Sequence, residues 1–80
     1  MYYTYILLNA SKNKTYTGHT NNLQLRLIQH NSGKSEFSRK HGPWSILHSE
    51  TFEEEIEAIK RESYFKTAAG RKWIKKNLFR

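Results

Sequence analysis

The sequence predicts a single α/β domain of the α+β type, with three strands and about three helices around one small core. Eighty residues with 36% hydrophobic and 14% aromatic content are enough to build one such core. Three short segments of the chain have strand composition or alternation, and three others have helical spacing of their apolar residues. We therefore expect residues 1–80 to form one domain.

The N-terminal segment predicts a β-hairpin. Residues 2–8, YYTYILL, are aromatic or branched on both faces, which is typical of a central strand. The polar sequence NASKN predicts a turn, and KTYTGHT predicts the second strand. With the turn centred between Ala10 and Ser11, Tyr5 lies directly opposite Tyr16, and both tyrosines share one face with Gly18.

The next segment predicts a helix with two ionisable residues beside its apolar side. A cap at Thr20 or Asn21 starts this helix, which is expected to run to about Ser32. Arg26 and His30 lie one turn apart at the border of the apolar stripe. Such residues are usually solvated, but next to two tyrosines they also fit an anion site, since arginine offers a fixed fork for phosphate and histidine exchanges a proton near neutral pH. The apolar side consists of Leu23, Leu27 and Ile28.

The C-terminal half predicts a strand and two helices. WSILHSETF, residues 44–52, alternates as a strand after a basic loop that ends at Pro43. Thr51 and Glu54 match a capping box, and the helix after them is expected to run to about Lys66. TAAG marks a break before a last basic helix, whose apolar residues are Trp73, Ile74 and Leu78.

Glu62 is the unusual residue of the first of these two helices. A carboxylate within an apolar helical arc must be paired, hydrogen-bonded or bound to a cation, because burying it alone is costly. A structural ion pair with Arg26 or Lys66 satisfies that requirement, and so does a bound metal ion. At 100° per residue, the arc that contains Glu62 consists of Ile56, Ala58, Ile59 and Phe65.

The charge balance favours a polyanionic partner. Fourteen Lys and Arg against seven acidic residues give a net charge of +7, which attracts nucleic acid above all. A basic surface that serves only solubility is the alternative. The absence of cysteine excludes disulfides and thiolate zinc sites. The longest apolar run, YILL, is too short for a signal peptide or a membrane span, so we expect a cytoplasmic protein that does not bind membranes.

Taken together, these motifs resemble the GIY-YIG nuclease superfamily over nearly the whole chain. The two motifs of its name correspond to Tyr3-Thr4-Tyr5 and Tyr16-Thr17-Gly18. NNLQLRLIQHNSGK resembles its first helix, and EEIEAIKRESYFK resembles the helix that carries its glutamate. The likeness is closest to the small single-domain bacterial branch related to the N-terminal domain of the excision-repair incision nucleases. Tyr3 and Thr17 replace the glycine and isoleucine of the motifs, and neither change removes a reactive group.

The resemblance implies a three-stranded antiparallel sheet flanked by helices, and a metal-dependent DNA endonuclease that acts in DNA repair or recombination. It implies Mg²⁺, with Mn²⁺ as the alternative, held by Glu62, and no other small-molecule cofactor. Tyr5 and Tyr16 would position or deprotonate the attacking water, Arg26 would hold the scissile phosphate, and His30 would relay the proton. Because a tyrosine has a reference pKa of about 10, the metal, Arg26 and the imidazole must lower it.

Further residues are expected to support this chemistry or to contact DNA. Gly18 is the structural glycine of the second motif, and His19 stands where some relatives have lysine. Contacts to backbone phosphates position DNA without reading its sequence, so selectivity for DNA structure is expected. Cutting both strands would take a homodimer or two encounters. The predicted DNA contacts are His19, Lys34, Arg39, Lys40, Arg71, Lys72, Lys75 and Lys76.

Two other functions remain open at this point. The first is a non-catalytic nucleic-acid-binding module on the same scaffold, against which the presence of all five catalytic residues argues. The second is a basic protein-interaction domain in which Glu62 makes a structural salt bridge.

Overall fold

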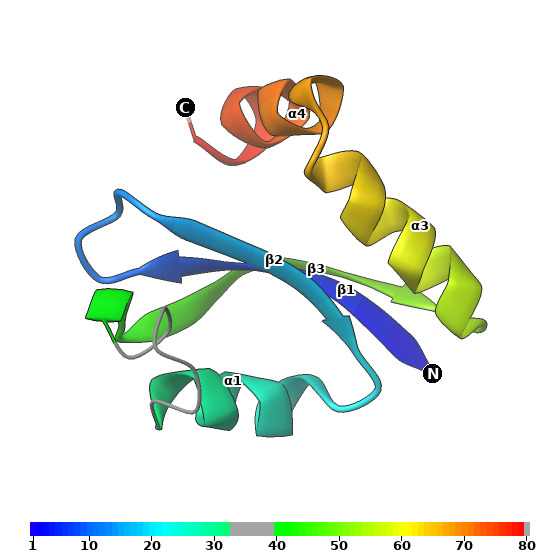
Figure 1. The fold of residues 1–80 in the computed structure, drawn as a ribbon, viewed down its shortest axis with the longest axis horizontal. Coiled ribbons are helices and arrows are strands. Elements are labelled where there is room, and N and C mark those ends of the chain that lie inside the picture. The colour runs from blue at the N-terminus through cyan, green and yellow to red at the C-terminus, as the bar shows by residue number, and fades with distance from the viewer. Residues whose placement is uncertain (33–39, 80) are drawn as a thin grey trace.

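The computed structural model describes residues 1–32 and 40–79, which form a three-stranded antiparallel sheet between helices (Figure 1). The strands are β1 (Tyr2–Asn9), β2 (Thr15–Thr20) and β3 (Trp44–Phe52). Helix α1 (Leu23–Asn31) covers one face, and α3 (Glu55–Phe65) and α4 (Ala68–Leu78) cover the other. The predicted fold class is confirmed. None of the described helices has the length and apolar character needed to cross a membrane.

The strand order β2-β1-β3 makes β1 the central strand and β2 an edge strand. Because side chains alternate along β1, its two faces build two separate small cores. Tyr5 and Leu7 pack with Trp44 on the face that α1 covers. Ile6 packs with Phe65 and with residues of α4 on the opposite face. This explains why the N-terminal strand is apolar on both sides.

The register between β1 and β2 differs from the prediction. Tyr5 pairs with Gly18, and Tyr16 pairs with Leu7 instead of Tyr5. The turn is centred one residue later than expected, because the side chain of Asn9 holds the residues after it outside the ladder. A shift of two residues leaves every side chain on its predicted face, so Tyr5, Tyr16 and Gly18 still share one.

The starts of α1 and α3 also lie later than predicted. Asn22 caps α1, one residue after the expected cap. The capping box of α3 is formed by Glu54 and Glu57, whereas Thr51 pairs with Tyr3 inside the sheet. The strand pairing therefore extends through the residues that the sequence pattern assigned to the helix cap.

Helix α3 is rotated relative to the predicted apolar arc. Ala58 and Phe65 face the sheet, and the Thr4 hydroxyl of β1 donates a hydrogen bond of 2.7 Å to the Ala58 carbonyl. This buried bond fixes the rotation of the helix and turns two isoleucines outward. A third isoleucine lies on the outer side of α1. Three residues expected in the core are therefore exposed: Ile28 by 62%, Ile56 by 56% and Ile59 by 36%.

The predicted break at TAAG is the boundary between α3 and α4. Thr67 caps α4 by accepting a hydrogen bond of 3.1 Å from the Gly70 backbone N–H. Gly70 packs directly on the end of α3, where an added Cβ would lie 1.9 Å from the Tyr64 carbonyl oxygen. The close corner between the two helices therefore depends on the missing side chain.

We predict that Gly70→Ala destabilises the protein by about 1 kcal/mol or more, because the new methyl group meets backbone that must shift. At an uncrowded helix position the same change stabilises by about 0.5–1 kcal/mol. The sign of the change in unfolding free energy therefore shows whether the packing clash or the helix propensity of alanine is larger. The exposed neighbour provides the control: Ala69→Gly is expected to cost about 1 kcal/mol or less. Urea unfolding measures both, and a Gly70→Ala protein as stable as the wild type would contradict the packing argument.

Candidate active site

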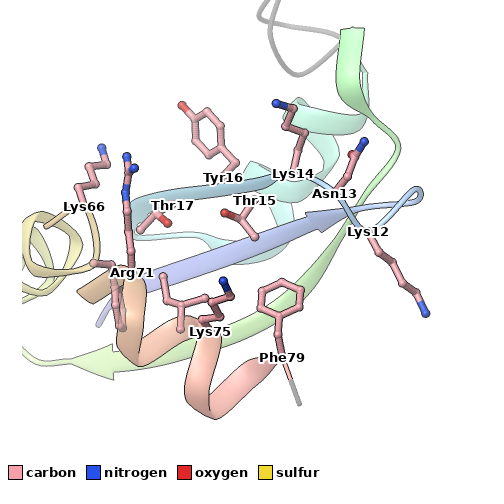
Figure 2. Close-up of a pocket in the computed structure, with 12 residues that line it drawn as sticks. Lys12, Asn13, Lys14, Thr15, Tyr16, Thr17, Lys66, Arg71, Lys75 and Phe79 are labelled. Atoms are coloured by element: carbon pink, nitrogen blue, oxygen red, sulfur yellow. The ribbon is translucent and has the colours of Figure 1, made fainter. Parts of the chain in front are cut away.

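The predicted catalytic residues surround the edge strand β2. Side chains alternate along this strand, so Tyr16 and Gly18 face α1, whereas His19 faces α3. Figure 2 shows the same alternation, with Tyr16 leaving β2 on the side opposite to Thr15 and Thr17. The site therefore has two halves, one on each side of the strand.

The phenol of Tyr5 organises the half that faces α1. Its oxygen accepts a hydrogen bond of 3.2 Å from Arg26 Nε and lies 3.1 Å from His30 Nε2. Arginine can only donate, so the phenol oxygen accepts from Arg26, and the phenol donates its one proton to His30 Nε2 when the histidine carries its own proton on Nδ1. His30 is buried in the core and Arg26 is partly exposed, and both bind the same buried phenol.

Gly18 provides the space for this phenol. An added Cβ on Gly18 would lie 2.5 Å from the Tyr5 hydroxyl oxygen and 2.8 Å from the ring carbon that bears it. Tyr5 is only 1% exposed and has no free volume into which it can retreat. The glycine of the second motif thus allows the tyrosine of the first motif to reach α1.

The electrostatics of this half differ from the expectation for Tyr5. Burial raises the pKa of Tyr5 above its ordinary value and outweighs the opposing effect of Arg26. The protein groups around Tyr5 therefore raise its pKa, opposite to the direction expected from Arg26 and the imidazole, and its phenol is protonated near pH 7. The hydrogen bond with Tyr5 raises the pKa of Arg26. Burial, and then the charge of Arg26, lower the pKa of His30, so its imidazole is neutral near pH 7.

Tyr16 is the more accessible tyrosine. It is half-buried, whereas Tyr5 is fully enclosed. Its ring packs against the His30 ring with centroids 4.4 Å apart and against Trp44 at 6.3 Å. These contacts hold the ring at the surface of the α1 half, next to the neutral imidazole.

Glu62 occupies the half that faces α3. Its Oε1 lies 2.5 Å from His19 Nδ1, and its Oε2 accepts a hydrogen bond of 2.7 Å from Lys66 Nζ. Burial would raise the pKa of Glu62, but the hydrogen bonds from Lys66 and His19 outweigh burial and lower it. Of the two ion-pair partners considered from the sequence, Lys66 is the one observed, whereas Arg26 binds Tyr5 on the other side.

The position of Glu62 follows from how α3 is held on the sheet. Thr4, which binds the helix backbone, is the cross-strand partner of His19. The neighbour of Glu62, Arg61, forms a bidentate ion pair with Glu50 of β3, at 2.9 and 3.2 Å. Helix α3 is thus anchored to β1 and to β3, and Glu62 meets His19 over the edge strand.

Glu62 is an ionised carboxylate, which is the kind of group that a divalent cation binds. Mg²⁺ keeps several waters and is commonly held by one or two carboxylates together with substrate phosphates. The side chain of Glu62 is 18% exposed, and a second carboxylate is near, with Glu55 Oε2 at 3.9 Å from His19 Nε2. Within residues 1–32 and 40–79, no three His, Cys, Asp or Glu side chains form a closed metal cage. Glu62 would therefore share the ion with water and substrate oxygens.

The predicted DNA contacts do not all gather at one place. His19 belongs to the Glu62 half, and Arg71 and Lys75 line a groove beside it. Three others are exposed and do not line that groove: Lys40, Lys72 and Lys76. Lys34 and Arg39 lie outside the described residues.

Lys66 was predicted only as a structural partner of Glu62 and not as a residue that contacts DNA. The sequence did contain a signal for this pairing, because Lys66 follows Glu62 by four residues and the two must share one face of a helix. Lys12 and Lys14 were missed as well, and they line the same groove as Arg71. Nothing in the local sequence relates that hairpin turn to the C-terminal helix.

We predict that His30 makes the stability of the protein fall on acidification. Its pKa is lowered in the folded state, so the unfolded chain takes up the proton first as the pH falls through about 6.5. Stability from this source is complete above that pH and is lost below it. The free energy of unfolding in urea, measured at pH 7.5 and 5.5, should fall more in the wild type than in His30→Gln.

This pH window separates His30 from the carboxylates. In Glu50 and Glu62, hydrogen bonds outweigh burial and lower the pKa below 4.5, so their stabilising effect is lost only at lower pH. An equal fall in stability in both proteins between pH 7.5 and 5.5 would contradict the assignment to His30.

Comparison with known proteins identifies the family of the chain. Residues 1–77 match the GIY-YIG catalytic domain. A UPF0213 protein of Bacillus velezensis is 40% identical over 72 residues, covering 89% of this chain and 72% of the relative. One of Staphylococcus haemolyticus is 32% identical over 75 residues, covering 92% and 90%. The solution NMR structure of a UPF0213 protein from Bacillus halodurans is similar with a TM-score of 0.57 and 28% identity, covering 99% of this chain and 88% of that one. The chain therefore belongs to the GIY-YIG family, and its relatives are small UPF0213 proteins.

Proposed function

We propose that this protein is a metal-dependent endonuclease that hydrolyses phosphodiester bonds in DNA. The observation that supports the proposal most is the arrangement of two unlike groups around one open strand edge. A neutral hydrogen-bonded cluster of Tyr5 and His30 with the Arg26 cation lies on one side of β2, and the Glu62 carboxylate lies on the other. In-line attack on a phosphodiester needs an oriented water, a group that stabilises negative charge and help for the leaving oxygen.

Each residue then has a distinct role. Arg26, held through its Nε by Tyr5, binds a non-bridging oxygen of the scissile phosphate. Tyr16 orients the attacking water with its hydroxyl, and the neutral His30 beside it accepts or passes on a proton. Tyr5 is a positioning residue, because its buried phenol holds both Arg26 and His30 and does not reach solvent.

Glu62 would hold the divalent cation, with Mg²⁺ expected and Mn²⁺ as the alternative. When bound, such an ion supplies positive charge to the phosphate and to the departing oxygen. His19 and Lys66 fix the orientation of the carboxylate by binding one oxygen each, and each oxygen keeps a further lone pair. The lowered pKa keeps Glu62 ionised and able to bind a cation at neutral pH.

The proposed substrate is selected by its shape. The net charge of +7 favours contacts to phosphates, which are the same in every sequence. Nicked, branched or damaged DNA is therefore the expected substrate class, and repair or recombination in the cytoplasm is the expected setting. A homodimer is the form in which both strands of a duplex would be cut in one encounter.

The second candidate function is a nucleic-acid-binding module without catalysis. The observation that favours it is that His19 and Lys66 already hydrogen-bond both oxygens of Glu62. In that case Glu62 forms a structural ion pair that holds α3 to the edge strand, and its charge has no role in chemistry.

We predict that Glu62→Gln lowers DNA cleavage by about 100-fold or more while DNA binding is retained, since loss of one electrostatic group in a site commonly has an effect of this size. Labelled single-stranded, duplex, nicked, flap and four-way-junction DNA, incubated with Mg²⁺, Mn²⁺ or EDTA, provides the assay. Glu53→Gln, which makes the same charge change at an exposed position, is the matched control. If the wild type cuts none of these DNAs and Glu62→Gln mainly loses stability, the structural ion pair is correct.

We predict different effects for the two tyrosines. Tyr5→Phe removes the shared partner of Arg26 and His30, so it should lower stability by about 1–3 kcal/mol as well as cleavage. Tyr16→Phe keeps the ring contact with His30 and loses a hydroxyl that interacts with Arg26, so stability should fall by about 1 kcal/mol while cleavage drops. Thermal unfolding and initial cleavage rates test the pair. Full activity of Tyr16→Phe would remove Tyr16 from the proposed mechanism.

A further inference from the structure

A cationic groove extends from the Glu62 half of the site along the face of β2 that is opposite to Tyr16. Its volume is about 820 Å³, and Figure 2 shows its lining. Strand β2 and the preceding turn form one wall, and the end of α3 and helix α4 form the other. The described lining contains no carboxylate and five basic residues, which are Lys12, Lys14, Lys66, Arg71 and Lys75. Of these, Lys14 lines the groove from the residue before β2 but directs its side chain to the same side of the strand as Tyr16 (Figure 2).

The remaining lining gives the groove a mixed character. Thr15 and Thr17 point into it from β2 (Figure 2). The buried side chains of Phe65 and Ile74 also line it. Phe79 stands at the end of the groove away from Lys66 and is 38% exposed. The groove therefore offers cations, hydroxyl groups and one accessible aromatic ring to the same ligand.

The groove and the candidate active site share Lys66. Its Nζ lies 2.7 Å from Glu62 Oε2, and its side chain also lines the groove. Arg71 stands next to Lys66 in Figure 2, and Lys75 follows one helical turn farther along α4. A strand that leaves the scissile phosphate at Glu62 therefore meets a row of cations directly.

The turn before β2, which belongs to the first wall of the groove, is held in place before any ligand binds. Asn9 is 3% exposed, and its Oδ1 accepts hydrogen bonds from the backbone N–H groups of Asn13 and Lys14, at 3.1 and 3.0 Å. Its Nδ2 donates a further bond of 2.8 Å to Asn13 Oδ1. The backbone that carries Lys12 and Lys14 is thus held in place, which lowers the entropy lost on binding.

This lining suits a single strand of DNA better than a duplex. A duplex presents phosphates and sugars outward and keeps its bases stacked inside, so Phe79 and the threonines would have little to bind. An unpaired strand exposes both its phosphates and its bases, and proteins that bind it combine a basic groove with aromatic side chains.

We propose that this groove binds an unpaired DNA segment next to the scissile phosphate, with Arg71 and Lys75 on its backbone and Phe79 stacked on a base. The inference rests on the proposed endonuclease function, and it names the feature of the DNA by which the protein would recognise its substrate. A duplex carrying an unpaired arm is then the preferred substrate over a continuous duplex.

The first test compares two charge-matched double variants in binding a fluorescent dT₁₂ oligonucleotide in EDTA, where no cleavage interferes. Arg71→Ala/Lys75→Ala removes groove residues, and Lys72→Ala/Lys76→Ala removes the same charge from the same helix outside the groove. For two lost phosphate contacts, the slope of log K against log [salt] should fall by about 1.4, with at least tenfold weaker binding at low salt. The control should change the slope by less than about half of this. Equal losses in the two variants would overturn the proposal.

The second test asks whether Phe79 stacks on a base. Phe79→Leu keeps apolar bulk and removes the ring, so binding to dT₁₂ should weaken about fivefold or more. Binding to an abasic oligonucleotide of the same length, which has no bases to stack, should not change. Equal effects on both oligonucleotides, or no effect on either, would overturn the stacking contact.

A third comparison separates this proposal from the proposed function. If the groove variant weakens blunt duplex binding as much as dT₁₂ binding, the groove is not a single-strand site and the proposal is wrong. If groove-dependent dT₁₂ binding is present but no DNA is cleaved with Mg²⁺ or Mn²⁺, the groove is correct and the endonuclease function fails. Cleavage that is equally fast on flap and continuous duplex DNA, with the groove variant unimpaired, supports the nuclease and rejects the groove.

Discussion

The buried phenol of Tyr5 is the contact on which the α1 half of the site depends. It lies against the backbone of Gly18, accepts a hydrogen bond from Arg26 and reaches His30, so one hydroxyl group joins two strands to a helix. A buried polar group without partners is costly, and here the partners are the residues proposed for catalysis. The same contacts that stabilise the fold therefore fix the distance between a cation and a neutral imidazole.

The two halves of the site rest on two separate small cores. Tyr5, Leu7 and Trp44 support α1, whereas Ile6, Phe65 and Ile74 support α3 and α4. The edge strand β2 contributes side chains to both halves, with Tyr16 on one side and His19 on the other. An open edge is usually a liability, but between two helices it also leaves room for a substrate strand to approach.

Local patterns were sufficient to predict the elements and the face of each strand residue. The period of two placed Tyr5, Tyr16 and Gly18 on one face even though the register was wrong, because a slip of two residues preserves it. The register itself depends on the side chain of Asn9 at the end of β1, whose hydrogen bonds lie outside any hydrophobic pattern. The rotation of α3 was missed for a similar reason, because long-range bonds hold the helix, from Thr4 to its backbone and from Arg61 to Glu50.

The predicted catalytic residues follow from a family resemblance. The sequence alone does not contain the environment of each of these residues. The pKa of Tyr5 rises because burial exceeds the effect of Arg26, a balance that requires the packed structure. Likewise, the cationic groove joins a hairpin turn to the last helix, and these segments are far apart in the chain.

The alternation of side chains along β2 limits where such a chain can gain or lose residues. Inserting or deleting one residue within this strand would exchange its two faces and move Tyr16 or His19 to the wrong half of the site. The turn between β1 and β2 is less constrained, since extra residues there leave the strand pairing intact as long as Asn9 keeps its hydrogen bonds to Asn13 and Lys14. Over evolutionary time, changes in length are therefore expected to accumulate in the turn, where they alter the reach of Lys12, while β2 keeps a fixed number of residues.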